Sequence, residues 1–572
     1  MSTPGLFTRV QNRARDAPDA VALVRGHRGG PGITYGHLSQ RVHAMTEALR
    51  AAGVRRGHKA VTMTRDPYDF VTVVYALLAL GAVPVLVEPR LPRGHLHQCL
   101  GEVAPHVFVG EPLAHAGRRA LGWGRGHVRV PLLTGGRLPG CGRPLTAVVP
   151  PGGGPFATAG EPPAEDLAMI AFTSGSTGVP KGAEYRYATL AAQVDALAPL
   201  LCGTAGGVLL SGFLPVVLLG PALGLTTLAP AVNHLAPART RPERILRPLL
   251  THRASVVAAS PAVLRLLAGH CARQQVSLPS VERVVSFGAA LRPGLAAALA
   301  QVLSPHAEVL SVYGATECLP VSAITAPEAQ HLRATAAGPR PGTCLGRPVP
   351  GVHVRILDAG HEPDSDSAGV GEIAVAGPNV SPAYHARPGA TAAAKSPAGC
   401  GLLHRTGDMG RLDASGRLWF HGRKAQRVTG DGFTLTTEDI EAATETVPGV
   451  RRTALVGVGP PGRQRAVLCA EPERPGGRRR RQELLRALRD ALDRHPDGAR
   501  VDAVLLHPGF PTDIRHNSKT DRARVAVWAA RRLRRTRGGR AAGAAAGKER
   551  EAGEERAAGG ERAAGRRTDE GR

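Results

Sequence analysis

The chain contains the stretch Thr173-Ser174-Gly175-Ser176-Thr177-Gly178-Val179-Pro180-Lys181-Gly182, which directly follows the apolar run Met-Ile-Ala-Phe at 169–172. The apolar run is typical of a buried strand, and the residues after it form a loop rich in hydroxyl groups and glycine. Glycines let the main chain approach an anion, so that N–H groups and hydroxyls can surround a polyphosphate and Lys181 can add positive charge. A Walker P-loop requires Gly-x-x-x-x-Gly-Lys-Ser/Thr, whereas here Pro180 precedes the lysine and Gly182 follows it. The stretch therefore predicts a phosphate-binding loop of a different kind.

Further motifs follow this loop along the chain. They are Ser286-Phe287-Gly288-Ala289-Ala290, Val312-Tyr313-Gly314-Ala315-Thr316-Glu317, Arg405-Thr406-Gly407-Asp408 with Gly422-Arg423, and Asn517-Ser518-Lys519. Together with the loop they resemble the signatures of the adenylate-forming superfamily, which includes acyl-CoA synthetases, nonribosomal-peptide adenylation domains and firefly luciferase. The resemblance covers nearly the whole chain except its C-terminal tail, and it implies ATP-dependent, AMP-forming activation of a carboxylic acid.

The resemblance also implies roles for individual residues. It places phosphate contacts at Thr173, Ser174, Gly175, Ser176, Thr177, Gly178, Lys181 and Thr316, adenine contacts at Gly288, Ala289 and Ala290, further nucleotide contacts at Tyr313 and Gly314, the ribose at Asp408 and Arg423, and Mg²⁺ at Glu317. A carboxylate that accepts from two vicinal hydroxyls is a sound physical basis for the role of Asp408. Lys519 is expected to contact both the acyl carboxylate and the α-phosphate, where a positive charge stabilises the transition state.

The predicted fold is α/β. Apolar runs of 4–8 residues alternate with helical stretches up to about residue 320, which predicts parallel sheets covered by helices. From about 345 the pattern changes to a Gly- and Pro-punctuated β subdomain, and a small α+β domain follows from 423. We expect an N-terminal AMP-binding domain over 1–422, a mobile C-terminal domain over 423–530, and a disordered tail rich in Arg, Ala, Gly and Glu over 531–572.

The chain is strongly basic, with 72 Lys and Arg residues against 46 Asp and Glu, a net charge of +26 and a pI near 10.9. Only six of the basic residues are lysine, and the abundance of Arg, Ala, Gly and Pro is typical of a GC-rich genome. Basic residues are dispersed and aromatics make up 3%, so no specific nucleic-acid partner is expected. A nucleic-acid-binding protein and a degenerate adenylation fold that only binds nucleotide remain the alternatives from other classes.

Eight cysteines without a CxxC pattern or metal-ligand spacing fit a reduced cytosol. The N-terminal residues contain no apolar segment of the signal-peptide type. The most apolar early stretch, 70–87, contains Tyr75, Gly81 and Pro84, and it predicts a buried helix running into a strand. We expect a cytoplasmic protein without a transmembrane segment, whose oligomeric state the sequence leaves open.

Several details resemble one branch of the superfamily, the olefin-type β-lactone synthetases and their fatty-acid ligase relatives. They are Lys181-Gly182-Ala183-Glu184-Tyr185-Arg186, Pro221-Ala222-Leu223-Gly224, Cys318-Leu319-Pro320-Val321-Ser322 and Asp513-Ile514-Arg515-His516-Asn517-Ser518-Lys519. Members of this branch adenylate a long-chain β-hydroxy acid, whose hydroxyl then attacks the activated carbonyl. The alternative is a fatty acyl-CoA or acyl-carrier-protein ligase, for which coenzyme A is a possible cofactor. Ala425 stands where the superfamily commonly has Asp or Lys at its hinge, a departure that fits an enzyme without an external acceptor.

The segment 213–221, Phe-Leu-Pro-Val-Val-Leu-Leu-Gly-Pro, is apolar. It predicts either an apolar wall that accommodates the alkyl chain of a fatty acid or an ordinary core strand. No acidic residue lies in it to receive an amino group, which argues against an amino-acid substrate. A fatty acid is therefore the expected small-molecule partner.

Overall fold

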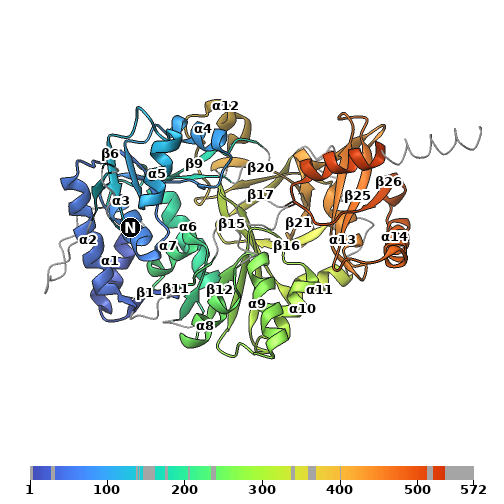
Figure 1. Cartoon of the computed structure of the whole chain (residues 1–572), viewed down its shortest axis with the longest axis horizontal. Helices are drawn as coiled ribbons and strands as arrows, with labels where there is room; N and C mark the ends of the chain where they lie inside the picture. Colours follow the sequence, from blue (N-terminus) through green and yellow to red (C-terminus); the bar gives the residue numbers. More distant parts are fainter. Residues whose placement is uncertain are drawn as a thin grey trace, which may run out of the picture. The chain divides into compact units, whose positions relative to one another are not determined.

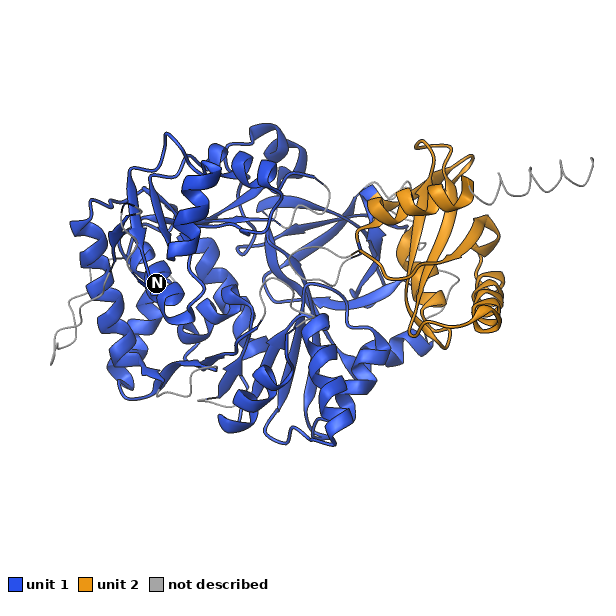
Figure 2. Cartoon of the chain, in the orientation of Figure 1, with its two compact units in different colours: residues 1–425, 512–520 blue, residues 426–511, 521–572 orange. Residues whose placement is uncertain are grey.

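The computed structural model describes residues 4–26, 32–136, 140, 142–145, 161–173, 178–203, 207–232, 240–335, 342–357, 369–399, 401–511 and 520–534. The chain forms two compact units, shown in Figure 2. Unit 1 comprises residues 1–425 and 512–520, and unit 2 comprises residues 426–511 and 521–572. Each unit is described by itself below.

A seven-stranded sheet in unit 1 has the order β7-β6-β5-β3-β4-β8-β9 among the described residues. Figure 1 labels β6 and β9 of this sheet. Its strands are β3 (Lys59–Met63), β4 (Val83–Leu86), β5 (Val107–Gly110), β6 (Val130–Leu133), β7 (Arg143–Pro144), β8 (Leu167–Phe172) and β9 (Gly182–Arg186). All neighbouring strands are parallel except β8 and β9, which form an antiparallel hairpin. The helices between its strands are α3 (Pro67–Ala79), α4 (Arg93–Val103) and α5 (Pro112–Leu121).

The larger sheet of unit 1 has fourteen strands in the described part of the chain, in the order β17-β18-β20-β21-β16-β15-β14-β13-β12-β10-β11-β1-β2, with β19 paired to β20. The strands are β1 (Val21–Arg25), β2 (Ile33–Thr34), β10 (Val208–Leu210), β11 (Thr226–Ala229), β12 (Val256–Ala259), β13 (Arg283–Phe287), β14 (Glu308–Ala315), β15 (Cys318–Thr325), β16 (Thr343–Pro348), β17 (His353–Leu357), β18 (Gly371–Ala376), β19 (Lys395–Ala398), β20 (Gly401–Leu412) and β21 (Leu418–Arg423). Strands β1, β11, β10, β12, β13 and β14 are parallel, and pairing is antiparallel from β14 to β17.

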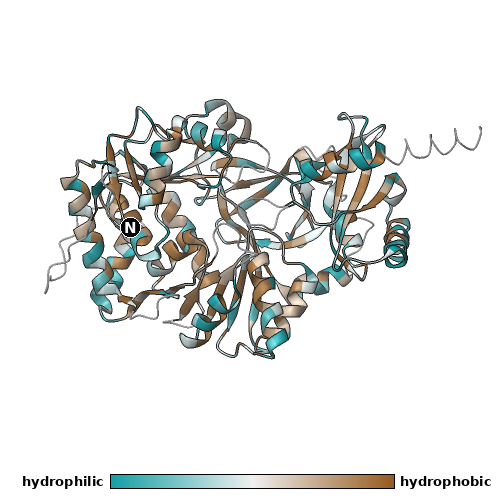
Figure 3. Ribbon diagram, in the orientation of Figure 1, coloured by the Kyte–Doolittle hydropathy of each residue, from teal (hydrophilic) through white to brown (hydrophobic). Residues whose placement is uncertain are grey.

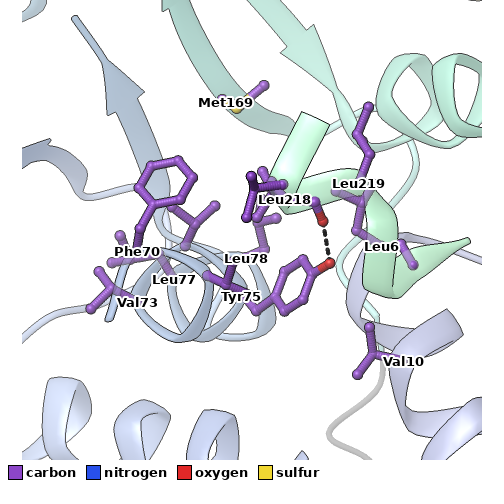
Figure 4. Close-up of a cluster of buried hydrophobic side chains, with 14 of the residues drawn as sticks. Leu6, Val10, Phe70, Val73, Tyr75, Leu77, Leu78, Met169, Leu218 and Leu219 are labelled. Carbon is purple, nitrogen blue, oxygen red and sulfur yellow. Dashed lines mark hydrogen bonds between the residues drawn. The ribbon is translucent and has the colours of Figure 1, made fainter. Parts of the chain in front are cut away.

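Helices cover both faces of the seven-stranded sheet and of the parallel part of the larger sheet. The remaining helices of unit 1 are α1 (Leu6–Asp16), α2 (Tyr35–Ala51), α6 (Tyr187–Leu201), α7 (Leu214–Ala222), α8 (Glu243–Thr251), α9 (Pro261–Gln274), α10 (Pro293–Ala300), α11 (Ala326–Thr335) and α12 (Pro388–Ala394). One core joins side chains of α1, α2, α3, α6 and α7 to both sheets. Figure 4 shows part of this core, where the buried Tyr75 hydroxyl donates to the main-chain oxygen of Leu218. Successive residues of β12 alternate between this core and a second core under α8, α9 and α10, as expected for a strand buried on both faces.

Unit 2 is a small α+β domain. Its elements are β22 (Val428–Gly430), β23 (Phe433–Leu435), α13 (Thr437–Thr444), β24 (Val450–Val458), β25 (Arg465–Pro472), α14 (Arg478–Asp493), β26 (Val501–Leu506), a helix over 522–534 and the short helical turns η2 (Lys424–Gln426) and η3 (Gly498–Arg500), of which η2 spans the division between the units. Residues of β25 alternate between a core with α13 and α14 and a core with the helix 522–534. Figure 3 shows β25 as largely hydrophobic and α14 as largely hydrophilic, consistent with a sheet covered on both faces.

The predicted fold class is confirmed: parallel-rich sheets with helices, an antiparallel β subdomain and a small α+β domain are all present. The predicted buried helix and strand over 70–87 are α3 and β4. The domain boundary at 423 stays a prediction. The described part of the chain contains no helix that is both long and apolar enough to cross a membrane.

Two predictions need correction. Of the two alternatives for 213–221, the core strand is wrong, because most of the segment forms the helix α7, which begins at Leu214 with Pro215 in its first turn and is buried from Val216 onward. The predicted disordered tail begins too early, because residues 531–534 still belong to the helix 522–534, whose Leu533 packs against the core. The rest of that tail, 535–572, lies outside the described residues.

Candidate active site

The predicted phosphate loop connects the antiparallel strands β8 and β9. Its two ends are tied together, because Thr173 N donates to Lys181 O at 2.9 Å and Lys181 N donates to Thr173 Oγ1 at 3.1 Å. Gly178 has φ +148°, a conformation that favours glycine. Ser174, Gly175, Ser176 and Thr177 lie outside the described residues. The structure thus fixes the base of the loop and the start of the Lys181 side chain.

The second motif is the tight hairpin between β14 and β15. Ala315 pairs with Cys318, so Thr316 and Glu317 form a two-residue turn. Gly314 is required next to this turn, because a Cβ there would lie 2.7 Å from Leu319 Cδ1 and 2.9 Å from Cys318 O. The hydroxyl of Tyr185 in β9 donates to Thr316 O and so links the two hairpins directly.

A linking segment, residues 380–387, crosses between the two hairpins. Val380 forms a bridge with Cys318, and Ser381 N donates to Glu317 O at 2.8 Å. At its other end Tyr384 forms a bridge with Ala183 of β9. Main-chain hydrogen bonds therefore hold both hairpins against one short segment, although the hairpins are far apart in the sequence.

Tyr384 brings the two motifs together. Its hydroxyl donates to Glu317 Oε1 at 2.6 Å, and Lys181 Nζ lies 4.7 Å from the centre of its ring. Tyr384 is 5% exposed, and burial and the Glu317 carboxylate raise its pKa, so the phenol remains a proton donor. No sequence motif marks Tyr384 as a site residue. Aromatic residues make up only 3% of the chain, and this rarity was the one signal that could have drawn attention to Tyr384.

The predicted ribose pair is formed by neighbouring strands. Asp408 of β20 lies opposite Arg423 of β21, and Arg423 Nε is 3.3 Å from Asp408 Oδ1. Tyr313 OH donates to Asp408 Oδ2 at 2.8 Å, and burial and Asp408 raise the pKa of Tyr313 well above its usual value. Asp408 is buried, and its Oδ1 has no hydrogen-bond partner among the described residues. The ribose role of Asp408 and Arg423 stays a prediction.

The predicted adenine loop begins where β13 ends. Gly288, with φ +93°, and Ala289 and Ala290 follow Phe287, which lies opposite Val312 in the parallel register with β14. The adenine loop and the Tyr313–Gly314 motif therefore leave neighbouring strands at their carboxyl ends. This is the edge where ligands bind in parallel α/β sheets.

Lys519 lies outside the described residues. Of the residues that flank it in unit 2, Asp521 N donates to Pro511 O at 2.9 Å. The catalytic role of Lys519 stays a prediction.

The surroundings of Glu317 suit a Mg²⁺ ion better than a metal ion that takes three or more ligands from the protein. Tyr384 binds Oε1, and no described residue donates a hydrogen bond to Oε2. The described residues contain no group of three or more His, Cys, Asp or Glu side chains that could hold a metal. Mg²⁺ usually keeps several waters and binds one or two carboxylates together with substrate phosphates, so a single available carboxylate oxygen suits it.

Comparison with known proteins identifies the class. The profile of the AMP-binding enzyme family matches residues 10–385, and the chain belongs to this family. It is an AMP-forming ligase or synthetase that activates an acid.

Two relatives are similar over almost their whole length. The chain is 41% identical over 554 residues to the olefin β-lactone synthetase of Stenotrophomonas maltophilia (strain K279a), covering 92% of this chain and 98% of that protein. It is 39% identical over 539 residues to the olefin β-lactone synthetase of Xanthomonas campestris pv. campestris, covering 90% and 96%.

Solved structures share the fold. The amide bond synthetase McbA from Marinactinospora thermotolerans superposes with a TM-score of 0.76 at 24% identity, covering 91% of this chain and 99% of that one. ATP-bound MatB from Rhodopseudomonas palustris superposes with a TM-score of 0.74 at 21% identity, covering 93% and 99%.

Proposed function

We propose that this enzyme uses ATP and Mg²⁺ to activate a long-chain β-hydroxy fatty acid as its acyl-adenylate and then converts the adenylate into a β-lactone. The observation that carries the proposal is the 41% identity to an olefin β-lactone synthetase over almost the whole of both chains. The tied ends of the phosphate loop and the adjacent Asp408 and Arg423 side chains support nucleotide binding at this site.

The first step is adenylation. A carboxylate oxygen of the acid forms a bond to the α-phosphorus of ATP, the bond from that phosphorus to the bridging oxygen breaks, and pyrophosphate leaves. In our proposal Lys181 and Thr316 bind phosphate oxygens, Asp408 and Arg423 orient the ribose, and Lys519 stabilises the charge that develops during attack. Mg²⁺, when bound at Glu317, supplies positive charge against the phosphate oxygens.

The second step needs no external acceptor. The β-hydroxyl oxygen forms a bond to the carbonyl carbon, the bond from that carbon to the phosphate oxygen breaks, and AMP leaves with that oxygen. The hydroxyl proton passes to solvent. The lactone therefore has the mass of the acid minus one water.

The apolar segment 213–221 lines a cavity, but Arg65, Asp66 and Glu111 line it too, so the proposal of an alkyl substrate rests on the relatives rather than on this cavity. Leu214 and Val217 of α7 line a cavity of about 280 Å³ together with apolar residues at the end of β11. Two acidic side chains also line it, but both already have partners: Asp66 pairs with Arg25 at 2.6 Å, and Glu111 accepts from Arg65 N at 2.6 Å.

The experiment incubates the enzyme with ATP, Mg²⁺ and a racemic long-chain β-hydroxy acid, with and without coenzyme A, and analyses products by mass spectrometry. We expect AMP and a product of the acid mass minus water in both tubes. The matched control is the acid of equal length without the hydroxyl, which we expect to give pyrophosphate and acyl-adenylate but no lactone. An acyl-CoA that forms only with coenzyme A would instead establish a fatty acid–CoA ligase.

A further inference from the structure

A buried lysine lies beside the proposed phosphate and metal site. Lys395, the first residue of β19, is 6% exposed. Its Nζ donates to Ser381 O at 2.5 Å and lies 5.6 Å from the centre of the Tyr384 ring. No carboxylate of the described residues lies within ion-pair distance of it. Lysine is almost never fully buried unless it is paired, so this position requires an explanation.

The charge at Lys395 is costly to maintain. Burial lowers its pKa to about 8, against the opposing effects of Cys318 and Glu317. His404 also faces this region, and burial together with Lys395 lowers the pKa of His404 to about 4. A methionine of similar length would fill the same space without this desolvation penalty. Packing alone therefore does not explain a lysine here.

The composition of the chain supports the same conclusion. The chain contains six lysines among 72 basic residues, so arginine is its usual cation. A compact ammonium group differs from the planar guanidinium of arginine in size and hydrogen-bonding geometry. Lys395 is buried against a carbonyl and an aromatic ring. At such a position, the size and hydrogen-bonding geometry of the cation decide whether it fits.

We propose that Lys395 is a positioning residue for the nucleotide and metal site, and that it acts through Tyr384 and Ser381. Its ammonium binds Ser381 O, while Ser381 N binds Glu317 O at 2.8 Å. It also shares the Tyr384 ring with Lys181, and the Tyr384 hydroxyl binds Glu317 Oε1. Through these contacts with Ser381 and Tyr384, Lys395 holds the linking segment in place and fixes the positions of Lys181 and Glu317. This inference rests on the proposed binding of ATP and Mg²⁺ at these two residues.

The test compares Lys395→Met with Lys395→Arg, Tyr384→Phe and the double variant Lys395→Met/Tyr384→Phe. Binding of Mg·ATP is measured by calorimetry, which needs no acid substrate. We expect Lys395→Met to weaken Mg·ATP binding by about thirtyfold, the size of one desolvated cation–π contact. We expect Lys395→Arg to restore part of the affinity. The matched control is Lys59→Met, which removes a half-buried lysine that holds His385 at the far end of the linking segment; we expect its affinity to match the wild type.

Adenylation rates give a second measurement. We expect Lys395→Met to lower kcat and raise KM for ATP while leaving KM for the acid unchanged. Because Lys395 acts through Tyr384, the double variant should be little worse than the more impaired single variant. The unfolding temperature of Lys395→Met should be no lower than that of the wild type, since methionine keeps the packing and carries no desolvation penalty.

Three outcomes overturn the inference. Wild-type affinity and kcat in Lys395→Met would mean that the ammonium has no role. A lowered unfolding temperature without rescue by arginine would make Lys395 a structural residue, and strictly additive losses in the double variant would exclude action through Tyr384. A wild-type enzyme that binds no Mg·ATP and releases no pyrophosphate with any acid would refute the proposed function instead.

Discussion

Replacing Arg522 by leucine tests the best-defined charged interaction in unit 2. The Glu441 side chain is 2% exposed, and Arg522 binds both of its oxygens, with 2.6 Å between Nη2 and Oε2. Arg522 also donates to Leu455 O at 3.1 Å, while Leu455 N donates to Glu441 Oε1 at 2.7 Å. The substitution removes three of these hydrogen bonds and leaves a buried carboxylate without its counter-charge.

The expected loss of unfolding free energy follows from the burial of Glu441. Removing one partner of a buried ion pair costs about 3–5 kcal/mol in the free energy of unfolding. Burial raises the pKa of Glu441 and Arg522 lowers it, so the pKa rises further in the variant. A carboxyl group with a raised folded-state pKa destabilises the protein as pH rises above its unfolded-state value and leaves it unaffected below. We therefore expect a larger loss of stability at pH 7.5 than at pH 4.

Hydrogen exchange read by mass spectrometry measures this effect in unit 2 alone. Peptides from α13 and β24 should exchange about 10² to 10⁴ times faster than in the wild type at pH 7.5, since each 1.4 kcal/mol is a factor of ten. The exposed Arg524 provides the control Arg524→Leu, which we expect to leave exchange unchanged. The double variant Glu441→Gln/Arg522→Leu should recover most of the protection. A cost below about 1 kcal/mol, or an equal cost at both pH values, would refute the reasoning.

Four further predictions concern unit 1 and the catalytic lysine. Asp408→Asn should weaken AMP binding by about 1.5–3 kcal/mol, the range for hydrogen bonds to a charged group, and unchanged affinity in a titration would exclude the ribose role. Gly314→Ala should lower adenylation at least tenfold, because its Cβ would meet Leu319 and Cys318 O, whereas Gly294→Ala, with open space around its Cβ, should be active. Lys519→Ala should abolish adenylate formation but keep ATP binding; acyl-AMP production by this variant would count against the assignment. Glu317→Gln should raise the Mg²⁺ concentration needed for half-maximal rate, and an unchanged requirement would contradict its role as a metal ligand.

Features of the fold and the site that depend on neighbouring residues could be predicted from the sequence. Hydroxyls, glycines and Lys181 in one loop indicated a phosphate site, and the alternation of apolar runs with helical stretches indicated parallel sheets. The segment 213–221 was misjudged for a physical reason. A fully buried apolar run has no polar face, so its periodicity cannot distinguish a strand from the helix α7 that it forms.

Long-range contacts explain the other omissions. Tyr384 and Lys395 gain significance only through Lys181 and Glu317, which are distant in sequence. No short-range pattern marks such a contact. The tail was placed too early because composition alone cannot show where burial ends, and Leu533 still packs against the sheet of unit 2.

The linking segment has a consequence for how the enzyme is made. Residue 181 emerges from the ribosome long before residue 317, and residues 380–387 emerge later still. Each hairpin can form from its own neighbouring strands, but the bridges to Ala183 and Cys318 must wait for the linking segment. A nascent chain that ends before this segment therefore carries both motifs without the contact that joins them, and the enzyme stays inactive until most of unit 1 has been synthesised.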